Sequence, residues 1–206
     1  MTRTGDSLTD RFADALRALG ERDAESFPFL GPEECREWLA LAGTLEFRRA
    51  RPLVGEGERQ VRQDFEICDR FPVESPFWAL ARLVEAPLNR ALANLASPPV
   101  ALPFRLNDLV VQRYPAGSRG ITPHRDHVRY VGIVANLVLA GRARFSVCRD
   151  RSGRDARDVP ESPGSLILMR NAGFGGLRDR PFHSLSEVTE RRVIVGLRCR
   201  KGEGGP

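Results

Sequence analysis

The sequence predicts an α+β fold in which N-terminal helices buttress a double-stranded β-helix, the jelly roll built from two facing sheets. Helical apolar stripes are confined to the first half of the chain. Short β-rich runs separated by turn residues fill the second half, and no repeat or low-complexity linker divides the two. We expect a single domain over residues 1–206, with 1–98 as helical support and substrate lid and 99–200 as the jelly-roll core.

The composition is that of an ordinary globular protein, with 41% hydrophobic and 29% charged residues. No apolar stretch approaches the roughly 18 residues that span a bilayer, and the N-terminus has no apolar signal core. We therefore expect a cytoplasmic protein that does not enter membranes. The net charge is +5, but the arginines are scattered among acids, so the charge favours nucleic-acid binding only modestly.

The first two helices are predicted from their ends. Ser7 is a suitable N-cap for a first helix that stops at Gly20. Pro32 suits the first turn of a second helix, which we expect to run to about Leu41. The apolar stripe of the first helix consists of Leu8, Phe12, Leu16 and Leu19.

A third helix is predicted over residues 75–95. Pro87 lies inside it and has no N–H to donate, so we expect a kink or a split there. Residues 45–69, between the second and third helices, are mixed and polar, which predicts a strand and a loop. The apolar face of the third helix is expected to contain Trp78, Leu80, Leu83, Val84, Leu88 and Leu92.

The β-rich runs after Pro99 have strand length and are bounded by turn signals such as Pro-Ala-Gly, Ser-Gly and Pro-Gly. This alternation of short strands and turns is typical of an antiparallel barrel or jelly roll. The predicted strands cover residues 109–114, 130–139, 143–148, 165–169 and 192–199.

A metal site is predicted from the chain's 3 histidines. Pro123 favours extended backbone before it, and in an extended segment His124 and Asp126 share one face. His183 precedes the last β-rich run and is the expected third ligand. Two histidines and one carboxylate on one face leave coordination positions open, an arrangement suited to non-haem Fe(II).

His127 is the alternative to His124 within this segment. It adjoins Asp126 and is expected to face the opposite way, beside the metal ligands or at the surface. If the strand is irregular there, His127 takes the place of His124.

The last strand carries two arginines on one face. Val193, Val195, Leu197 and Cys199 alternate with Arg192, Ile194, Gly196 and Arg198, so the first set is expected to pack on the core. Arg192 and Arg198 are about 20 Å apart along a strand, and their side chains reach inward to leave a gap for a short dicarboxylate. Gly196 lies between them and has no side chain to obstruct it.

These motifs together resemble the Fe(II)/2-oxoglutarate-dependent oxygenases, and their AlkB-like branch in particular, over about residues 107–200. Gln112-Arg113-Tyr114-Pro115-Ala116-Gly117 is similar to the AlkB strand and turn that lead to the first ligand. His124-Arg125-Asp126 resembles the iron-binding His-x-Asp, His183 the distal histidine, and Arg192 to Arg198 the Arg-x5-Arg motif.

The resemblance implies a dioxygenase that binds Fe(II) through His124, Asp126 and His183 and uses 2-oxoglutarate and dioxygen. It implies that Arg192 and Tyr114 hold the distal carboxylate of 2-oxoglutarate. Arg198 would lie near the carboxylate that chelates iron, and Gln112 would contribute its side-chain amide. Hydroxylation or oxidative demethylation of an organic substrate, with release of succinate and CO2, is the expected reaction.

The sequence departs from the AlkB repair enzymes at several positions. Gln112 replaces their usual Asn, and Ile194 stands where they often have a second Asn. Val128 stands where they have an acid that contacts the damaged base, and the spacing from His183 to Arg192 is shorter. These departures favour a small molecule, amino acid or peptide as substrate over alkylated nucleic acid.

Substrate contacts are expected from loops around the mouth of the barrel. The candidates are Arg62 and Asp64 in residues 59–69, Tyr130 after the His-x-Asp, and Phe174 in the Gly-rich segment 171–180. That Gly-rich segment is either a lid or an ordinary surface loop.

Other functions remain alternatives. An AlkB-type demethylase would need a basic groove and an aromatic side chain to stack a flipped base. A non-catalytic sensor would hold the metal and 2-oxoglutarate without turnover. A zinc hydrolase with the same three ligands would leave Arg192 and Arg198 without a role. The sequence does not determine the oligomeric state.

Overall fold

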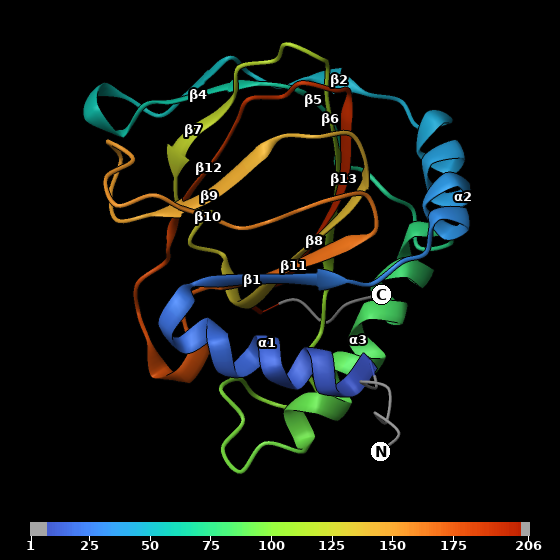
Figure 1. Cartoon of the computed structure of the whole chain (residues 1–206), viewed down its shortest axis with the longest axis vertical. Helices are drawn as coiled ribbons and strands as arrows, with labels where there is room; N and C mark the ends of the chain where they lie inside the picture. Colours follow the sequence, from blue (N-terminus) through green and yellow to red (C-terminus); the bar gives the residue numbers. More distant parts are fainter. Residues whose placement is uncertain (1–7, 203–206) are drawn as a thin grey trace, which may run out of the picture.

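Two antiparallel sheets form the centre of the protein in the computed structural model, which describes residues 8–202 (Figure 1). This confirms the predicted α+β jelly-roll core. The first sheet has 7 strands, in the order β1 (Ala24–Pro28), β11 (Ser165–Arg170), β8 (Tyr130–Ala140), β13 (Arg192–Arg200), β6 (Asp108–Tyr114), β5 (Glu66–Cys68) and β2 (Arg48–Arg49). The second has 6, in the order β10 (Arg157–Asp158), β9 (Arg144–Cys148), β12 (Phe182–Ser186), β7 (Gly120–His124), β4 (Val61–Asp64) and β3 (Leu53–Val54).

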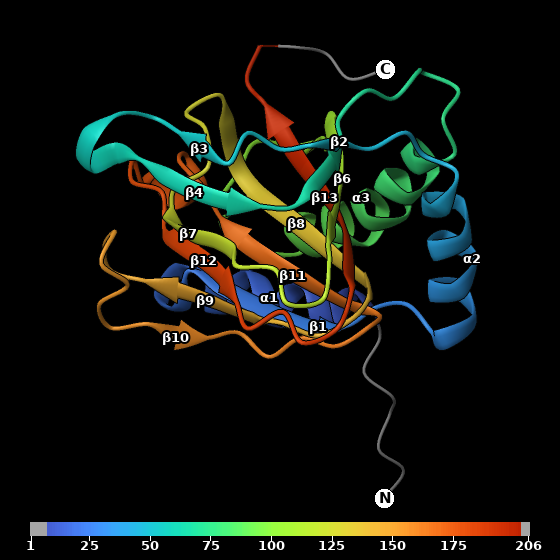
Figure 2. The same cartoon turned by 90° about the horizontal axis from the view of Figure 1, so that it is seen from above.

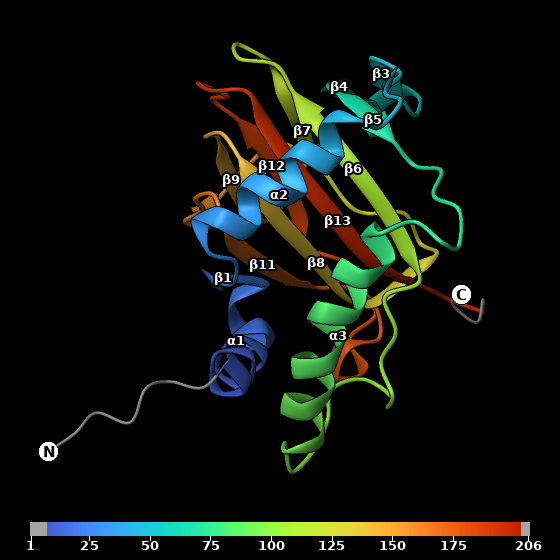
Figure 3. The ribbon, with the colours of Figure 1, turned by 90° about the vertical axis from the view of Figure 1, so that its right-hand side faces the viewer.

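Three helices pack on the outer face of the seven-stranded sheet, as Figure 3 shows for α2 and α3. They are α1 (Leu8–Arg22), α2 (Pro32–Gly43) and α3 (Phe77–Ala93). Within residues 8–202, the helices are too short or too polar to cross a membrane. The helical layer therefore lies on the side of the sheet that faces away from the second sheet.

The strands of the seven-stranded sheet bury both faces, because each face has its own apolar core. Along β13, Val195 and Leu197 face the core under the helices, and Ile194 faces the core between the two sheets. Phe145 of β9 lines the same inner core. The predicted alternation of the last strand is confirmed, and its second face, with both arginines, lies inside the jelly roll.

The helices differ from prediction in three details. α1 continues past Gly20 to Arg22, and Ser7 lies outside the described residues. α3 runs through Pro87 without a break. Pro87 has no N–H to donate to the Leu83 carbonyl, and Leu83 is 45% exposed, so this turn of the helix borders solvent. The expectation that Leu83 belongs to the apolar face is wrong for the same reason.

Residues 48–68 form a ribbon of short strands instead of the expected single strand and loop. β2 and β5 extend the seven-stranded sheet, whereas β3 and β4 extend the other, so the ribbon passes from one sheet to the other (Figure 2). A 3-10 turn at Gly57–Arg59 separates β3 from β4. Strands of two residues are too short to show a hydrophobic period, which is why the sequence did not predict them.

Candidate metal centre and cosubstrate cavity

His124 and His183 lie side by side on neighbouring strands. β7 pairs antiparallel with β12, and His124 is directly opposite His183 in the register. Opposed residues of an antiparallel pair point to the same face, so both imidazoles enter the space between the sheets. Their ring centroids are 4.2 Å apart. An irregularity of the pairing follows immediately, between His183 and Leu185.

Asp126 joins the two histidines from just beyond the end of β7. One potential ligand atom from each of His124, Asp126 and His183 lies within 4.8 Å of the other two. The Asp126 Oδ1 atom is 3.9 Å from His183 Nε2. Arg180 donates a hydrogen bond to the Asp126 carbonyl. The structure thus brings together the three side chains predicted as ligands, although the strand itself ends at His124.

The two imidazoles have the orientation and protonation that a metal ion requires. His124 Nδ1 donates to the Thr122 carbonyl at 3.0 Å, and His183 Nδ1 to the Pro181 carbonyl at 3.4 Å. This leaves both Nε2 lone pairs free. Burial, and then the neighbouring His183, lower the pKa of His124 to about 3.

Of the three candidate ligands, both imidazoles are neutral and the Asp126 carboxylate is ionised. Burial also lowers the pKa of His183. Burial of Asp126 raises its pKa, but His183 and the Arg198 guanidinium outweigh this effect, so the pKa lies below its usual value. Two neutral imidazoles and one carboxylate are the donor set of non-haem Fe(II) sites, so the residues fit this metal.

Arg198 places a buried positive charge next to this group. Its guanidinium lies over the Tyr130 ring, 5.1 Å from the centroid, and 3.6 Å from the Asp108 carboxylate. Its Nε is buried and has no hydrogen-bond partner among the described residues. An unpartnered buried donor beside a metal-ligand set fits an anionic group bound at the same metal.

A narrow cavity extends from the three metal-ligating candidates between the sheets. It is lined by Gln112 and Tyr114 of β6, Asn136 of β8, and both arginines of β13. Asn136 was not predicted. The signal in the sequence is a polar side chain at an inward position of an otherwise apolar strand.

Gly196 keeps this cavity open. A Cβ at residue 196 would be 2.9 Å from Val110 Cγ1 and 3.2 Å from Asn136 Oδ1. It would also be 3.5 Å from an Arg198 guanidinium nitrogen. A larger residue at this position would displace the side chains that line the cavity.

Arg192 is at the other end of the cavity and is already paired. Its Nε donates to Glu161 Oε1 at 2.6 Å, and a terminal nitrogen donates to Oε2 at 2.5 Å. Its guanidinium carbon is 5.8 Å from the Tyr114 ring centroid. The sequence analysis missed Glu161, and no motif marks it. The expected gap for a dicarboxylate between Arg192 and Arg198 is therefore bounded at one end by an arginine whose charge Glu161 already balances.

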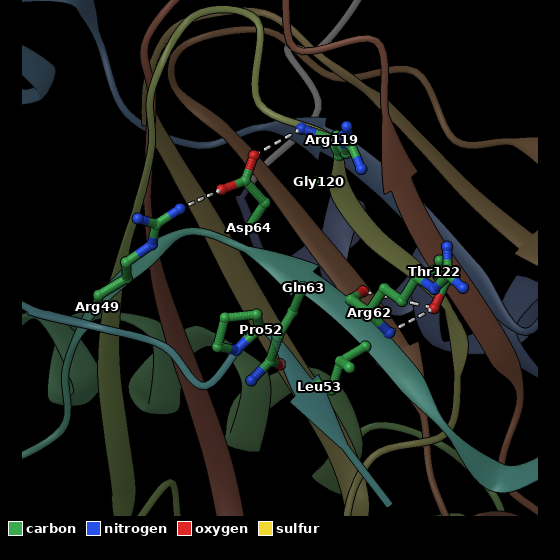
Figure 4. Close-up of a pocket in the computed structure, with 9 residues that line it drawn as sticks. All are labelled: Arg49, Pro52, Leu53, Arg62, Gln63, Asp64, Arg119, Gly120 and Thr122. Atoms are coloured by element: carbon green, nitrogen blue, oxygen red, sulfur yellow. Dashed lines mark hydrogen bonds and ion pairs between the residues drawn. The ribbon is translucent and has the colours of Figure 1, made fainter. Parts of the chain in front are cut away.

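Two of the predicted substrate residues lie outside the narrow cavity that extends from His124, Asp126 and His183. Arg62 and Asp64 border a groove of about 660 Å³ along β3, β4 and β7 (Figure 4). Asp64 lies between Arg49, at 3.6 Å, and the Arg119 backbone N–H, at 3.0 Å. The Arg62 backbone N–H donates to Thr122 at 3.0 Å.

The other predicted residues differ in their positions. Tyr130 lines the cleft that leads to His124 and Asp126, and its hydroxyl accepts a hydrogen bond from the Arg129 guanidinium at 2.8 Å. Phe174 is 4% exposed and packs in the core under the helices, away from the cavity. His127 is exposed, and its Nδ1 accepts from the Arg129 backbone N–H at 3.2 Å.

A wide cleft of about 780 Å³ leads from solvent to His124 and Asp126. We call it the mouth cleft. Among residues 8–202, Asp69 is the one acid besides Asp126 that lines it, and Asp69 is paired with Arg48 at 2.5 Å. The arginines that line the mouth cleft are Arg48, Arg51, Arg70, Arg125, Arg129 and Arg198.

Two facing antiparallel sheets that enclose two histidines and an aspartate are the architecture of the 2-oxoglutarate-Fe(II) oxygenases, and this chain has their fold. No family model and no curated protein sequence matches it. Among solved structures, a prolyl-4-hydroxylase of Pseudomonas putida is 17% identical with a TM-score of 0.60, over 93% of this chain and 100% of that one.

Two further structures have the same fold. A Trichoplax adhaerens prolyl hydroxylase, solved with a hypoxia-inducible-factor peptide fragment, is 14% identical with a TM-score of 0.63, over 94% of this chain and 91% of that one. An oxidoreductase of the 2-oxoglutarate-Fe(II) oxygenase family from Burkholderia pseudomallei is 14% identical with a TM-score of 0.63, over 99% and 95%.

Proposed function

We propose that this protein is an Fe(II)- and 2-oxoglutarate-dependent dioxygenase that hydroxylates or oxidatively demethylates an organic substrate. The observation that carries the proposal is the group formed by His124, Asp126 and His183, whose ligand atoms lie within 4.8 Å of one another. A buried arginine with an unpartnered Nε lies beside it. The fold shared with the oxygenases supports the same reaction class.

The protein's own residues position the reactants. His124, Asp126 and His183 would hold the ferrous ion and leave coordination positions open for the cosubstrate and dioxygen. A ferrous ion with 2-oxoglutarate and dioxygen supplies the oxidation, with succinate and CO2 as co-products. Tyr130 and Phe65, which are 6% and 5% exposed, help to keep water away from the inner end of the mouth cleft.

The two arginines of β13 are suited to bind the two carboxylates of 2-oxoglutarate. Arg198 is next to the metal ligands and offers its free Nε to the carboxylate that chelates iron. Arg192 and Tyr114, at the other end of the cavity, are suited to the distal carboxylate. Gln112 lines the same cavity and adds an amide.

Succinate formation tests the reaction class. The purified protein with Fe(II), 2-oxoglutarate and oxygen is expected to form succinate slowly without any added substrate, and to form none in the absence of iron. His183→Ala is the matched blank, because it removes one ligand and leaves both arginines. Succinate at equal rates in both proteins would contradict the proposal.

The charge of the mouth cleft favours an anionic substrate, either a small molecule or a peptide. Six arginines line the cleft against two aspartates, one of which is already paired. Arg51 and Arg70 are exposed at its outer part and have no acidic partner among the described residues. A cleft lined mainly by positive charge raises the local concentration of negatively charged ligands.

Charge reversal tests the substrate class. Matched acidic and neutral peptides and metabolites are screened for compounds that accelerate 2-oxoglutarate consumption. Acidic compounds are expected to be the better ones, and the double variant Arg51→Glu, Arg70→Glu should lose this preference. Arg36→Glu, on the outer surface of α2, is the control. A neutral compound with an unchanged rate in the double variant would refute an anionic substrate.

An AlkB-type demethylase is the second candidate function, because a basic cleft also suits phosphates. Phe65 and Tyr130, which line the mouth cleft, are buried, so among the described lining residues the imidazole of His127 is the one exposed ring for stacking a flipped base. Release of formaldehyde from a methylated oligonucleotide would favour this function. Binding of iron and 2-oxoglutarate without any turnover would instead favour a sensor.

A further inference from the structure

The pair formed by Arg192 and Glu161 is buried at the closed end of the cavity. Both guanidinium–carboxylate bonds are short, at 2.6 and 2.5 Å. The two side chains are 2% and 3% exposed. A carboxylate of the protein thus occupies one edge of the arginine that the proposed function assigns to the cosubstrate.

The loop that carries Glu161 is fixed to both sheets. The Val159 N–H donates to the Phe145 carbonyl at 2.9 Å, and the Gly164 N–H donates to the Val138 carbonyl at 2.8 Å. Gly164 has a φ of +91°, and a Cβ there would be 2.3 Å from the Leu30 carbonyl oxygen. The backbone is therefore anchored on both sides of Glu161, which keeps its carboxylate within reach of Arg192.

Arg192 keeps donors for a second anion. A guanidinium has five N–H groups, and Glu161 occupies the edge formed by Nε and one terminal nitrogen. The other edge stays free. Arg192 lines the cavity together with Tyr114, whereas Glu161 does not. A distal carboxylate of the cosubstrate thus meets the free edge while Glu161 remains on the other.

We propose that Glu161 is a permanent counter-ion that weakens the hold of Arg192 on the distal carboxylate of the keto acid. This inference rests on the proposed function. Two carboxylates on adjacent edges of one guanidinium repel each other. With charge centres roughly 4 Å and 7 Å apart, this repulsion cancels about half of the attraction to the arginine. Glu161 is thus a specificity-determining residue, since it reduces the preference for a diacid over a monoacid.

The test compares two keto acids of equal length, one with and one without the distal carboxylate. Calorimetric titration of 2-oxoglutarate and 2-oxopentanoate into the Mn(II)-loaded protein gives both dissociation constants. Glu161→Gln is expected to bind 2-oxoglutarate about tenfold more tightly than wild type, with little change for 2-oxopentanoate. Glu66→Gln is the control, because it removes the acid of another arginine pair, with Arg113 at 2.6 Å, outside the cavity.

Thermal unfolding provides a second measurement. Without ligand, Glu161→Gln should melt lower than wild type, because Arg192 loses its counter-ion. Addition of 2-oxoglutarate should then raise its Tm more than that of wild type, because the ligand supplies the missing charge. Glu161→Asp keeps the charge and withdraws it by one methylene, so its affinity should be intermediate. It also serves if the Gln variant does not fold.

Equal or weaker binding of 2-oxoglutarate by Glu161→Gln, or by Glu161→Asp if the former is unfolded, would overturn the counter-ion role while leaving the proposed function intact. If no variant and no wild-type protein binds 2-oxoglutarate although Mn(II) binds, the proposed function itself fails, and the role of Glu161 fails with it. The two failures are therefore distinguishable.

Discussion

His124 is directly opposite His183 across the antiparallel pair of β7 and β12, with ring centroids 4.2 Å apart. Because the register of the two strands fixes this relationship, two of the three candidate ligands are positioned by backbone hydrogen bonds rather than by a flexible loop. Asp126, two residues beyond His124, completes the group from the end of the same strand.

Removal of one candidate ligand should abolish metal binding without unfolding the protein. His183→Ala or Asp126→Ala is expected to eliminate Mn(II) or Fe(II) binding in a calorimetric titration, because two ligands hold a divalent ion far more weakly than three. Thermal unfolding should show a folded protein in each case. His127→Ala is the control and should bind metal like wild type. Loss of metal in His127→Ala would mean that His127 is a ligand.

The stability of the metal-free protein should depend on pH. The pKa of His124 is lowered from 6.5 to about 3 on folding. The unfolded chain therefore takes up this proton at a higher pH than the folded chain, and lowering the pH from about 6.5 towards 3 favours unfolding. Urea unfolding at a series of pH values should show a free energy that is greatest above this window and falls within it.

His124→Asn provides the control for the pH dependence, because an amide does not titrate in this range. The variant should lose less stability than wild type over the same interval. An identical slope in the two proteins would show that His124 does not carry the effect. Burial also lowers the pKa of His183, so some dependence should remain.

Gly196→Ala should destabilise the fold and disturb the cavity. The new Cβ would lie 2.9 Å from Val110 Cγ1, and overpacking of this kind costs about 1 to 3 kcal/mol. Urea unfolding measures the loss. Gly20→Ala is the matched control, because nothing lies within 4 Å of its Cβ and it is inside α1. It should stabilise the protein by about 0.5 to 1 kcal/mol. Equal effects at the two positions would contradict the packing argument.

Arg192→Met should be more harmful than the double variant Arg192→Met, Glu161→Gln. The single change leaves the Glu161 carboxylate buried without a partner, which costs about 3 to 5 kcal/mol. The double change removes both charges and should recover part of this loss. A double-mutant cycle of urea unfolding measures the coupling. If the two changes are additive, the pair does not contribute to stability as described.

Much of the fold could be predicted because its signals are local. The alternation along β13 and the apolar stripes of α1 and α3 depend on residues close in sequence, and the structure confirms them except at Leu83. The short strands of residues 48–68 could not be predicted, since β4 and β5 pair with β7 and β6 from the middle of the chain, and β2 and β3 pair in turn with β5 and β4. Their pairing depends on tertiary contacts and not on propensity.

The candidate site, too, could be predicted only in part from the sequence. His124, Asp126 and His183 were found from residue type and spacing, and the structure brings their side chains together. Glu161 could not be found, because it lies in a proline-flanked loop and meets Arg192 only when that loop closes between the sheets. Phe174 was predicted to contact substrate because it lies in the Gly-rich segment 171–180, yet its side chain is buried under the helices.

The position of the three helices has a consequence for how this scaffold can change. They cover the face of the seven-stranded sheet that is remote from His124, Asp126 and His183, while in the described part of the N-terminal half the residues that border the mouth cleft lie within 48–70. Ala50 and Phe65 of this segment belong to the core between the sheets, so changes confined to its exposed side chains, such as Arg51 and Arg70, would alter the charge of the mouth cleft while leaving both apolar cores in place. The three candidate ligands and the exposed arginines of this segment thus lie in separate stretches of the chain, so that either can change while the other is kept.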